Sequence, residues 1–272
     1  MRTCLRILLL SCALASFGQS LAGQTRTHDL PDGIALVTSH QGEVTIQSAE
    51  GKIRAAELHA VETLTGLEIT SADGDYIFFS LSNGIGLGVY GNSRVHFKHY
   101  QQRPFPAEKE NLEYEPTLSK LNVELLEGSL IFSAEHLSPL SEIVIQLPQG
   151  QVQISRGSGR VHYGGSDALI SITSGIITYS YPNTSEQEFI HAPNQVRISD
   201  ASARRGRIVE SKSIASDPAS EVTKHLVDAA RHASERVAFR VVGAGASIPQ
   251  PVLVAKPKAL QQPSPRPYRY LD

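Results

Sequence analysis

A short meander in the first half of the chain constrains the fold more than any other stretch. Two alternating apolar runs, Tyr76–Leu81 and Ile85–Tyr90, flank Ser82-Asn83-Gly84. Asn-Gly between apolar runs is the strongest short-range signal for a β-hairpin, because both turn residues tolerate positive φ. A second turn at Gly91-Asn92-Ser93 predicts a third strand over Arg94–Tyr100. This stretch is therefore predicted to be a β-meander.

Alternation along these strands separates two faces. One face is apolar and is expected to lie in the core; it carries Ile77, Phe79, Leu81, Ile85, Leu87 and Val89. Gly86 and Gly88 fall on the opposite face. Because they lack side chains, we expect another layer of the protein to approach closely there.

Short β runs of the same kind continue as far as residue 199, with turn residues at intervals of about 8–12 residues and no long segment of helical period. The pattern predicts an all-β domain over residues 34–200, built as a β-sandwich or a solenoid-like stack of short antiparallel strands. Residues 101–119 interrupt it with prolines and glutamates, which predicts a long loop insertion. In that insertion, Phe105 and Tyr114 are candidate interaction residues.

The start of the chain, residues 1–22, has the pattern of a secretory signal peptide. Two arginines precede an apolar run, and Ser20-Leu21-Ala22 is a small-x-small cleavage site. Residues 23–33 are then expected to form a flexible leader. A lipid anchor at Cys12 is the alternative, but the apolar run before this cysteine is short for a lipoprotein signal.

Cysteine usage agrees with export. Cys4 and Cys12 both lie in the predicted signal, so the mature chain would have no disulfide, thiolate zinc site or cysteine nucleophile. No later run approaches the roughly 20 apolar residues of a membrane span. We therefore expect a soluble, periplasmic or secreted bacterial protein.

The chain changes character after Asp200. Residues 23–200 carry 11 Lys/Arg against 21 Asp/Glu, whereas residues 201–272 carry 12 against 6. Three segments are expected there: a linker (201–215), an amphipathic helix (216–242) and a disordered proline-rich tail (243–272). The basic candidates for partner contact are Arg204, Arg205 and Arg207. A basic extension of this kind suits an anionic partner.

Glycine turns and alternating strands recur in a fixed order between residues 34 and 199: Gly42-Glu43-Val44, Glu50-Gly51-Lys52, Thr70–Gly74, Phe79–Gly84, Asn92–Val95, Val123–Leu130, Ile145–Val161 and Ile172–Ile177. In this order they resemble the FecR-like domain family, in the secreted form found singly in bacterial envelope proteins. The resemblance implies an all-β periplasmic module used for protein contact, and it carries over no catalytic residue. FecR regulators of iron uptake have a cytoplasmic anti-sigma segment and a membrane span before this domain, where this chain has its predicted signal.

No motif specifies a catalytic residue, a cofactor or a metal. His96 and His99 have H-x-x-H spacing, but on a strand they point to opposite faces, and zinc needs three or four converging ligands. The glycines between residues 84 and 91 are followed by no helix that could hold a phosphate. Four glutamates of the insertion lack the calcium-loop pattern: Glu108, Glu110, Glu113 and Glu115. The export signal disfavours a nucleic-acid partner.

Three functions remain as hypotheses. The first is a non-enzymatic exported module that senses or binds another envelope or outer-membrane protein, through residues 101–119 or an exposed sheet edge. The second is a cell-wall or glycan-binding module that uses the basic C-terminal region and aromatic residues: Tyr90, Tyr100, Phe105, Tyr114, Tyr179 and Tyr181. The third and weakest is an exported hydrolase. Contact between the basic region and an anionic polymer should weaken as salt rises, whereas a protein partner should stay bound at moderate salt.

Overall fold

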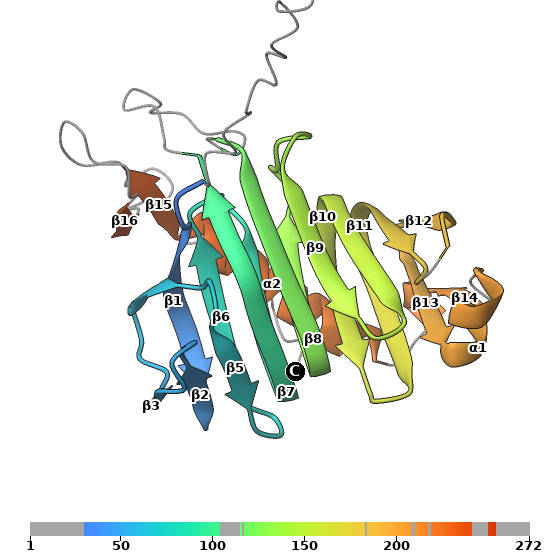
Figure 1. The fold of residues 1–272 in the computed structure, drawn as a ribbon, viewed down its shortest axis with the longest axis horizontal. Coiled ribbons are helices and arrows are strands. Elements are labelled where there is room, and N and C mark those ends of the chain that lie inside the picture. The colour runs from blue at the N-terminus through green and yellow to red at the C-terminus, as the bar shows by residue number, and fades with distance from the viewer. Residues whose placement is uncertain are drawn as a thin grey trace, which may run out of the picture.

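The computed structural model (Figure 1) describes residues 30–103, 115, 117–182, 184–207, 210–216, 219–240 and 250–253. Over these residues the protein is mostly β, with a large mixed sheet and two α-helices. The predicted all-β class with a C-terminal helix is confirmed. The predicted signal peptide, most of the leader, Phe105, Tyr114 and the tail after residue 253 lie outside the described residues.

The elements follow one another along the chain in a simple order. They are β1 (Ile34–Gln41), β2 (Val44–Gln47), β3 (Ile53–Ala55), β4 (Val61–Thr63), β5 (Glu68–Ser71), β6 (Tyr76–Leu81), β7 (Gly86–Gln102), β8 (Ser119–Ala134), β9 (Glu142–Leu147), β10 (Gly150–Tyr163), β11 (Asp167–Ser180), β12 (Gln187–His191), β13 (Asn194–Ser199), α1 (Asp200–Arg205), β14 (Glu210–Ser213), the 3-10 turn η1 (Ile214–Ser216), α2 (Ser220–Glu235), β15 (Val237–Arg240) and β16 (Gln250–Leu253).

Four long strands each contribute to both layers of a sandwich. The first half of β7 pairs with β6, and its second half pairs with β5. β10 and β11 divide in the same way, because their two halves have different neighbours. The first layer therefore runs β4-β1-β6-β7-β8-β10-β11-β13-β14, and the second runs β3-β2-β5-β7-β8-β9-β10-β11-β12. β8 and β9 are parallel.

The long strands correct the expectation of uniformly short ones. The sequence predicts a turn at Gly91-Asn92-Ser93 and another at Gly128, but β7 and β8 continue through both positions with shifts of register. Gly128 has a φ of 84°, and the space its side chain would fill is occupied by Ser93. Left-handed glycine bends a strand sharply without ending its ladder. These glycines therefore lie where strands pass from one layer to the other.

The apolar faces of the two layers enclose one core. The face predicted from the hairpin is confirmed as part of it: Ile77, Phe79, Leu81, Ile85, Leu87 and Val89 are all buried. Tyr100 is fully buried, and its hydroxyl oxygen accepts a hydrogen bond from the backbone N–H of Asn83 at 3.0 Å. The predicted Asn83-Gly84 turn is thereby tied to the next strand of the meander.

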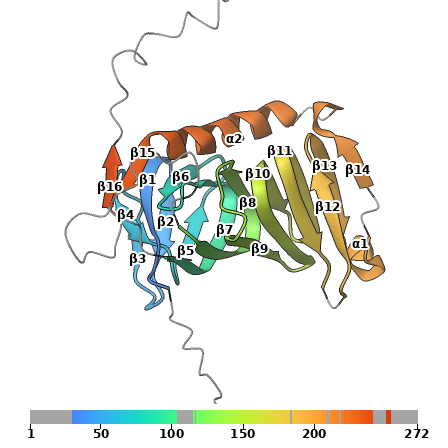
Figure 2. The ribbon, with the colours of Figure 1, turned by 90° about the horizontal axis from the view of Figure 1, so that it is seen from above.

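Helix α2 lies along the outer face of the first layer (Figure 2). Its apolar stripe packs on Phe78 and Ile131; the stripe is Leu226, Val227, Ala230 and Ala233. A Cβ at Gly86 would lie 1.7 Å from the carbonyl oxygen of Ala230. The close approach predicted at Gly86 is confirmed, and α2 is the layer that approaches.

The segments around α2 differ from the expected linker and helix. Residues 201–215 contain part of α1, all of β14, which extends the first layer beside β13, and the start of η1. α2 ends at Glu235, before the predicted end, and the chain continues as β15. Val237 and Phe239 of β15 pack against β1, and this packing replaces the last helical turns.

Candidate functional site

The basic residues predicted to meet a partner lie at one end of the sandwich. Arg204 and Arg205 occupy the last turn of α1, and Arg207 follows it; all three are exposed. The hydroxyl of Ser199 accepts a hydrogen bond from the backbone N–H of Ser202 and caps this short helix. The structure thus presents the three arginines to solvent at one end of the sandwich.

The histidine and the tyrosines considered as possible ligands lie on β7 and β11 or directly after β11. His96 lies 3.7 Å from the carboxylate of Glu124, and no group of metal-ligating side chains occurs among the described residues. Tyr100 and Tyr179 are fully buried, which removes them from the carbohydrate face considered above. Tyr181 is also largely buried, but it lines a groove described below.

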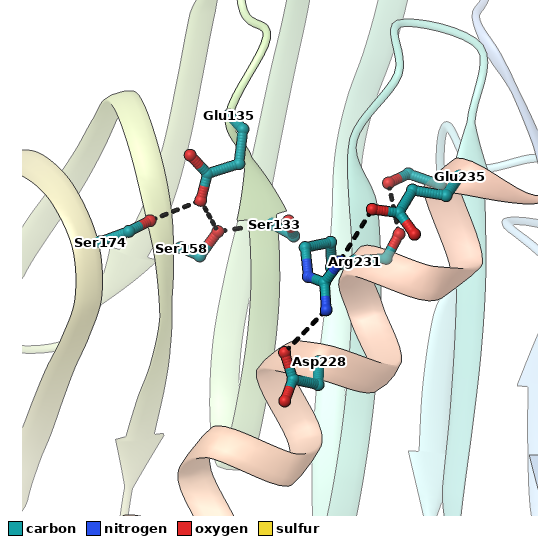
Figure 3. A network of polar contacts seen from close by, with 8 residues as sticks. Ser133, Glu135, Ser158, Ser174, Asp228, Arg231 and Glu235 are labelled. Atoms are coloured by element: carbon teal, nitrogen blue, oxygen red, sulfur yellow. Dashed lines mark hydrogen bonds and ion pairs between the residues drawn. The ribbon is translucent and has the colours of Figure 1, made fainter. Parts of the chain in front are cut away.

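Glu135 holds together the corner where β10 and β11 change layer. Its carboxylate accepts hydrogen bonds from Ser158 at 2.7 Å and Ser174 at 2.5 Å, as Figure 3 shows beside the Asp228–Arg231–Glu235 ion pairs of α2. Partial burial raises the pKa of Glu135, but the hydrogen bonds from Ser174 and Ser158, together with the charges of His136 and Arg156, outweigh it and hold the pKa below its ordinary value. The Ser158 hydroxyl also forms a hydrogen bond with the hydroxyl of Ser133 at 3.2 Å, so the cluster links β8, β10 and β11 and has a structural role.

Glu115, at the end of the predicted insertion, is buried instead of facing solvent. Its carboxylate accepts hydrogen bonds from the hydroxyls of Ser119 and Ser141 and from the backbone N–H of Ser138. Burial raises the pKa of Glu115, and the hydrogen bonds offset the rise only in part. The residue anchors the chain entering β8 to the β8–β9 connection.

The raised pKa of Glu115 predicts a pH dependence of stability. Since the folded state holds this proton more tightly than the unfolded state, its contribution to stability is fully present below the unfolded pKa and is lost as pH rises through the folded pKa. We expect the unfolding free energy of the wild type to fall, relative to that of Glu115→Gln, between about pH 4.5 and the neutral range. Urea unfolding of both proteins across this range measures the difference. Parallel pH profiles would contradict the burial of an ionisable Glu115.

No helix of the described residues covers the outer face of the second layer (Figure 2). This face carries a continuous row of polar residues. Side chains that are direct neighbours in register run across eight strands. This polar row consists of Gln47, Glu68, His96, Glu124, Gln146, Gln151, Ser180 and Gln187. Alternation explains most of the row, because the neighbours of Glu68, His96, Glu124, Gln146 and Ser180 on both sides are buried in the core.

The row ends in a groove of about 440 Å³ near the turns that join β9 to β10 and β11 to β12. Its polar lining includes the amides of Gln146, Gln151 and Gln187. Ser180 also lines the groove, and its hydroxyl oxygen is buried beneath the surface without a hydrogen-bond partner among the described residues. The described residues that line the groove include no charged side chain. The site therefore offers uncharged donors and acceptors to a ligand.

An exposed aromatic residue lies beside the groove. Phe189 of β12 is opposite Thr178 in register, two positions from Gln187 of the polar row, and is 67% exposed. Ile176 is its diagonal neighbour on the same face and is 43% exposed. Amides beside an exposed aromatic ring suit a ligand with both hydroxyl groups and apolar ring faces.

The sequence analysis missed these residues, although a signal for them exists. Glutamines occupy outward positions of β9, β10 and β12, at Gln146, Gln151, Gln153 and Gln187. Their alternation with buried apolar residues marks one solvent face. Which glutamines meet in a groove depends on the order of strands in the second layer, and the sequence does not specify that order.

Comparisons with known proteins leave the family of the chain open. No protein-family model matches the chain, and no curated protein matches it. Two crystal structures of a protein described as a "putative anti-sigma factor" from Parabacteroides distasonis ATCC 8503 are similar at 16% identity, with a TM-score of 0.39. The similarity covers 54% of this chain and 59% of the other chain. A TM-score this low supports no conclusion about function, so the FecR-like resemblance stays a hypothesis. No helix among the described residues is both long and apolar enough to cross a membrane.

Proposed function

We propose that the chain is an exported, non-enzymatic binding module whose second layer binds a glycan. The observation that carries this proposal is the amide-lined groove at the end of the polar row. Its volume of about 440 Å³ lies in the range of ordinary ligand pockets, about 300–1,000 Å³. The proposal follows the second sequence hypothesis in ligand class, but it moves the site from the basic C-terminal region to the glutamines of β9, β10 and β12.

Uncharged amides match sugar hydroxyls because each amide group both donates and accepts hydrogen bonds. The buried hydroxyl of Ser180 has no partner among the described residues, so a small rotation of this side chain toward a ligand would satisfy it. Phe189, exposed at the border of the groove, supplies a surface on which a sugar ring can pack. A glycan would therefore bind through hydrogen bonds and ring contact, with little dependence on charge.

Affinity electrophoresis through gels containing neutral or anionic cell-wall polysaccharides tests the proposal with the mature chain. We expect one polysaccharide to retard the wild type. In pull-down with the same polysaccharide in insoluble form, binding should persist in about 1 M NaCl, where the Debye length is only about 3 Å. The double variant Gln151→Ala/Gln187→Ala should bind at least tenfold more weakly.

Gln47→Ala is the matched control, since Gln47 lies in the same polar row at its opposite end. It should bind like the wild type. Failure of every polysaccharide to retard the protein, or equal loss in the control, would contradict the proposed groove. Loss of binding in salt, together with loss in Arg204→Ala/Arg205→Ala, would instead assign polymer contact to the basic end of the sandwich.

A protein partner remains the second candidate because Ile176 and Phe189 form a small exposed apolar pair. Apolar residues grouped on a surface mark interaction sites more often than isolated ones do. Binding of a partner protein that packs on this pair should be lost in the variant Phe189→Glu. It should be retained in Leu140→Glu, a control at an exposed leucine outside the pair. Retention of the partner by both variants would place the contact elsewhere on the protein.

A further inference from the structure

A second, chemically different cavity lies on the other side of the sandwich, between the first layer and the start of α2. Its volume is about 190 Å³. Three of its polar residues come from adjacent strands: Arg160 of β10, Ser171 of β11 and Gln195 of β13. They are consecutive partners in register, in a row that starts at Ile131 beneath α2. The row therefore passes from an apolar contact with the helix to a set of polar groups.

Arg160 is a partly buried cation without a carboxylate partner. Its Nε and Nη2 atoms donate to the hydroxyl oxygen of Ser129 at 3.1 and 2.8 Å, and its guanidinium carbon lies 5.9 Å from the centre of the Tyr90 ring. Among the described residues no Asp or Glu forms an ion pair with it. Burial of a cation is costly unless an anion compensates it. The described residues thus give this cation hydroxyl and aromatic contacts and no ion pair.

The polar side chains around the cavity are also unpaired. Gln195 is only 4% exposed and lines the cavity, yet its amide makes no hydrogen bond within the described residues. Ser171 and Thr223, each 5% exposed, line the same cavity with hydroxyls that have no hydrogen-bond partner there. Buried polar groups are almost always hydrogen-bonded. None of these three residues has a fully buried polar atom without a partner, so their polar groups are open to the cavity and can hydrogen-bond to a polar ligand in it.

The N-terminal end of α2 also favours a negatively charged ligand in this cavity. Ala219 at its N-cap provides no side-chain hydrogen bond to the first turn, and Ala219, Ser220 and Thr223 all line the cavity. The N-terminal end of a 16-residue helix favours a negative charge. His162 lines the cavity as well; burial, followed by the charge of Arg160, lowers its pKa, so it adds no second positive charge near neutral pH.

We propose that this cavity binds the carboxylate of a small hydroxylated organic acid, with the carboxylate on Arg160 and the first turn of α2. A single guanidinium matches a singly charged carboxylate in charge and in its planar, forked geometry. Gln195, Ser171 and Thr223 supply partners for hydroxyl groups, and Leu169 and Ile214 supply apolar contact for carbon atoms. The cavity is smaller than the pockets of drug-sized ligands, about 300–1,000 Å³, which restricts the ligand to a few carbon atoms.

The test uses the full mature chain and four probes: glycerate, its neutral counterpart glycerol, inorganic phosphate and sodium chloride at matched ionic strength. Isothermal titration calorimetry should show saturable binding of glycerate that glycerol and chloride do not reproduce. Arg160→Gln should weaken it at least tenfold. Arg156→Gln removes an exposed positive charge from the same strand and should leave it unchanged.

Gln195→Leu keeps Arg160 and provides an independent test should Arg160→Gln fail to fold. It should weaken glycerate binding several-fold, and the amide NMR shifts caused by glycerate should cluster at Ser171, Gln195 and Thr223. Absence of saturable glycerate binding, or equal weakening by Arg156→Gln, would overturn the site. Tighter binding of phosphate than of glycerate would overturn the assignment to a carboxylate.

Discussion

Replacing Gly86 by alanine is expected to detach α2 from the sandwich and to lower the free energy of unfolding by about 3 kcal/mol or more, at the upper end of what overpacking costs. The added Cβ would lie 1.7 Å from the carbonyl oxygen of Ala230. Neither β7 nor the helix backbone can give way by changing a rotamer, so the two elements must separate. Phe78 and Ile131, which the helix covers, would then be exposed.

Urea unfolding and limited proteolysis measure the effect of Gly86→Ala on stability and on the attachment of α2. Gly164→Ala is the matched control, because the nearest atom to an added Cβ there is 3.7 Å away; it should change stability by less than about 0.5 kcal/mol. Ser220 and Thr223 of α2 line the proposed carboxylate cavity beside Arg160, so Gly86→Ala should also abolish glycerate binding. Equal stability of the two variants would show that α2 does not pack on Gly86.

Replacing Gly128 by alanine should destabilise the protein by about 3 kcal/mol or more, because steric overlap adds to backbone strain. Gly128 has a φ of 84°, which by itself costs a residue with a Cβ about 1–2 kcal/mol. In addition, the new Cβ would lie 2.5 Å from the Cα of Ser93 and 2.6 Å from the carbonyl oxygen of Asn92. These are backbone atoms of the neighbouring bend in β7, so relief requires both strands to move.

Gly165→Ala separates the two causes of this loss. Gly165 has a similar φ of 88°, but no atom lies within 4 Å of an added Cβ. Its substitution should therefore show only the backbone cost, about 1–2 kcal/mol, in the same urea unfolding experiment. If both variants lost the same free energy, the close packing of the β7 and β8 bends would be refuted.

Local patterns in the sequence were sufficient to predict the elements of the hairpin and its apolar face. Asn83-Gly84 forms the predicted turn, and Gly86 receives another layer as expected. The amphipathic helix predicted after residue 216 also forms; Leu226 is buried on its apolar stripe, whereas Val222 is exposed. These features depend on residues close in sequence, whose spacing decides which face they share.

Features that depend on distant contacts could not be predicted in the same way. A glycine between two apolar runs of a sequence indicates a turn. The sequence therefore predicts strand ends at the glycines where β7 and β8 in fact bend and continue. The glycan groove requires β9, β10 and β12 to lie in one layer, and the Arg160 cavity requires three strands and α2 to meet. Arg204 and Arg205 were predicted from composition alone, and composition does not specify whether a groove forms beside them.

The most direct test of the glycan-binding account is a titration of the isotope-labelled mature chain with an oligosaccharide released from the retained polysaccharide, followed by amide NMR shifts. The account predicts shifts at Gln146, Gln151 and Gln187, which line the groove, and at Phe189, two positions from Gln187 on β12, and none along α2. Shifts confined to α1 and Arg207, or to the strands beneath α2, would contradict it and place the binding surface elsewhere on the sandwich.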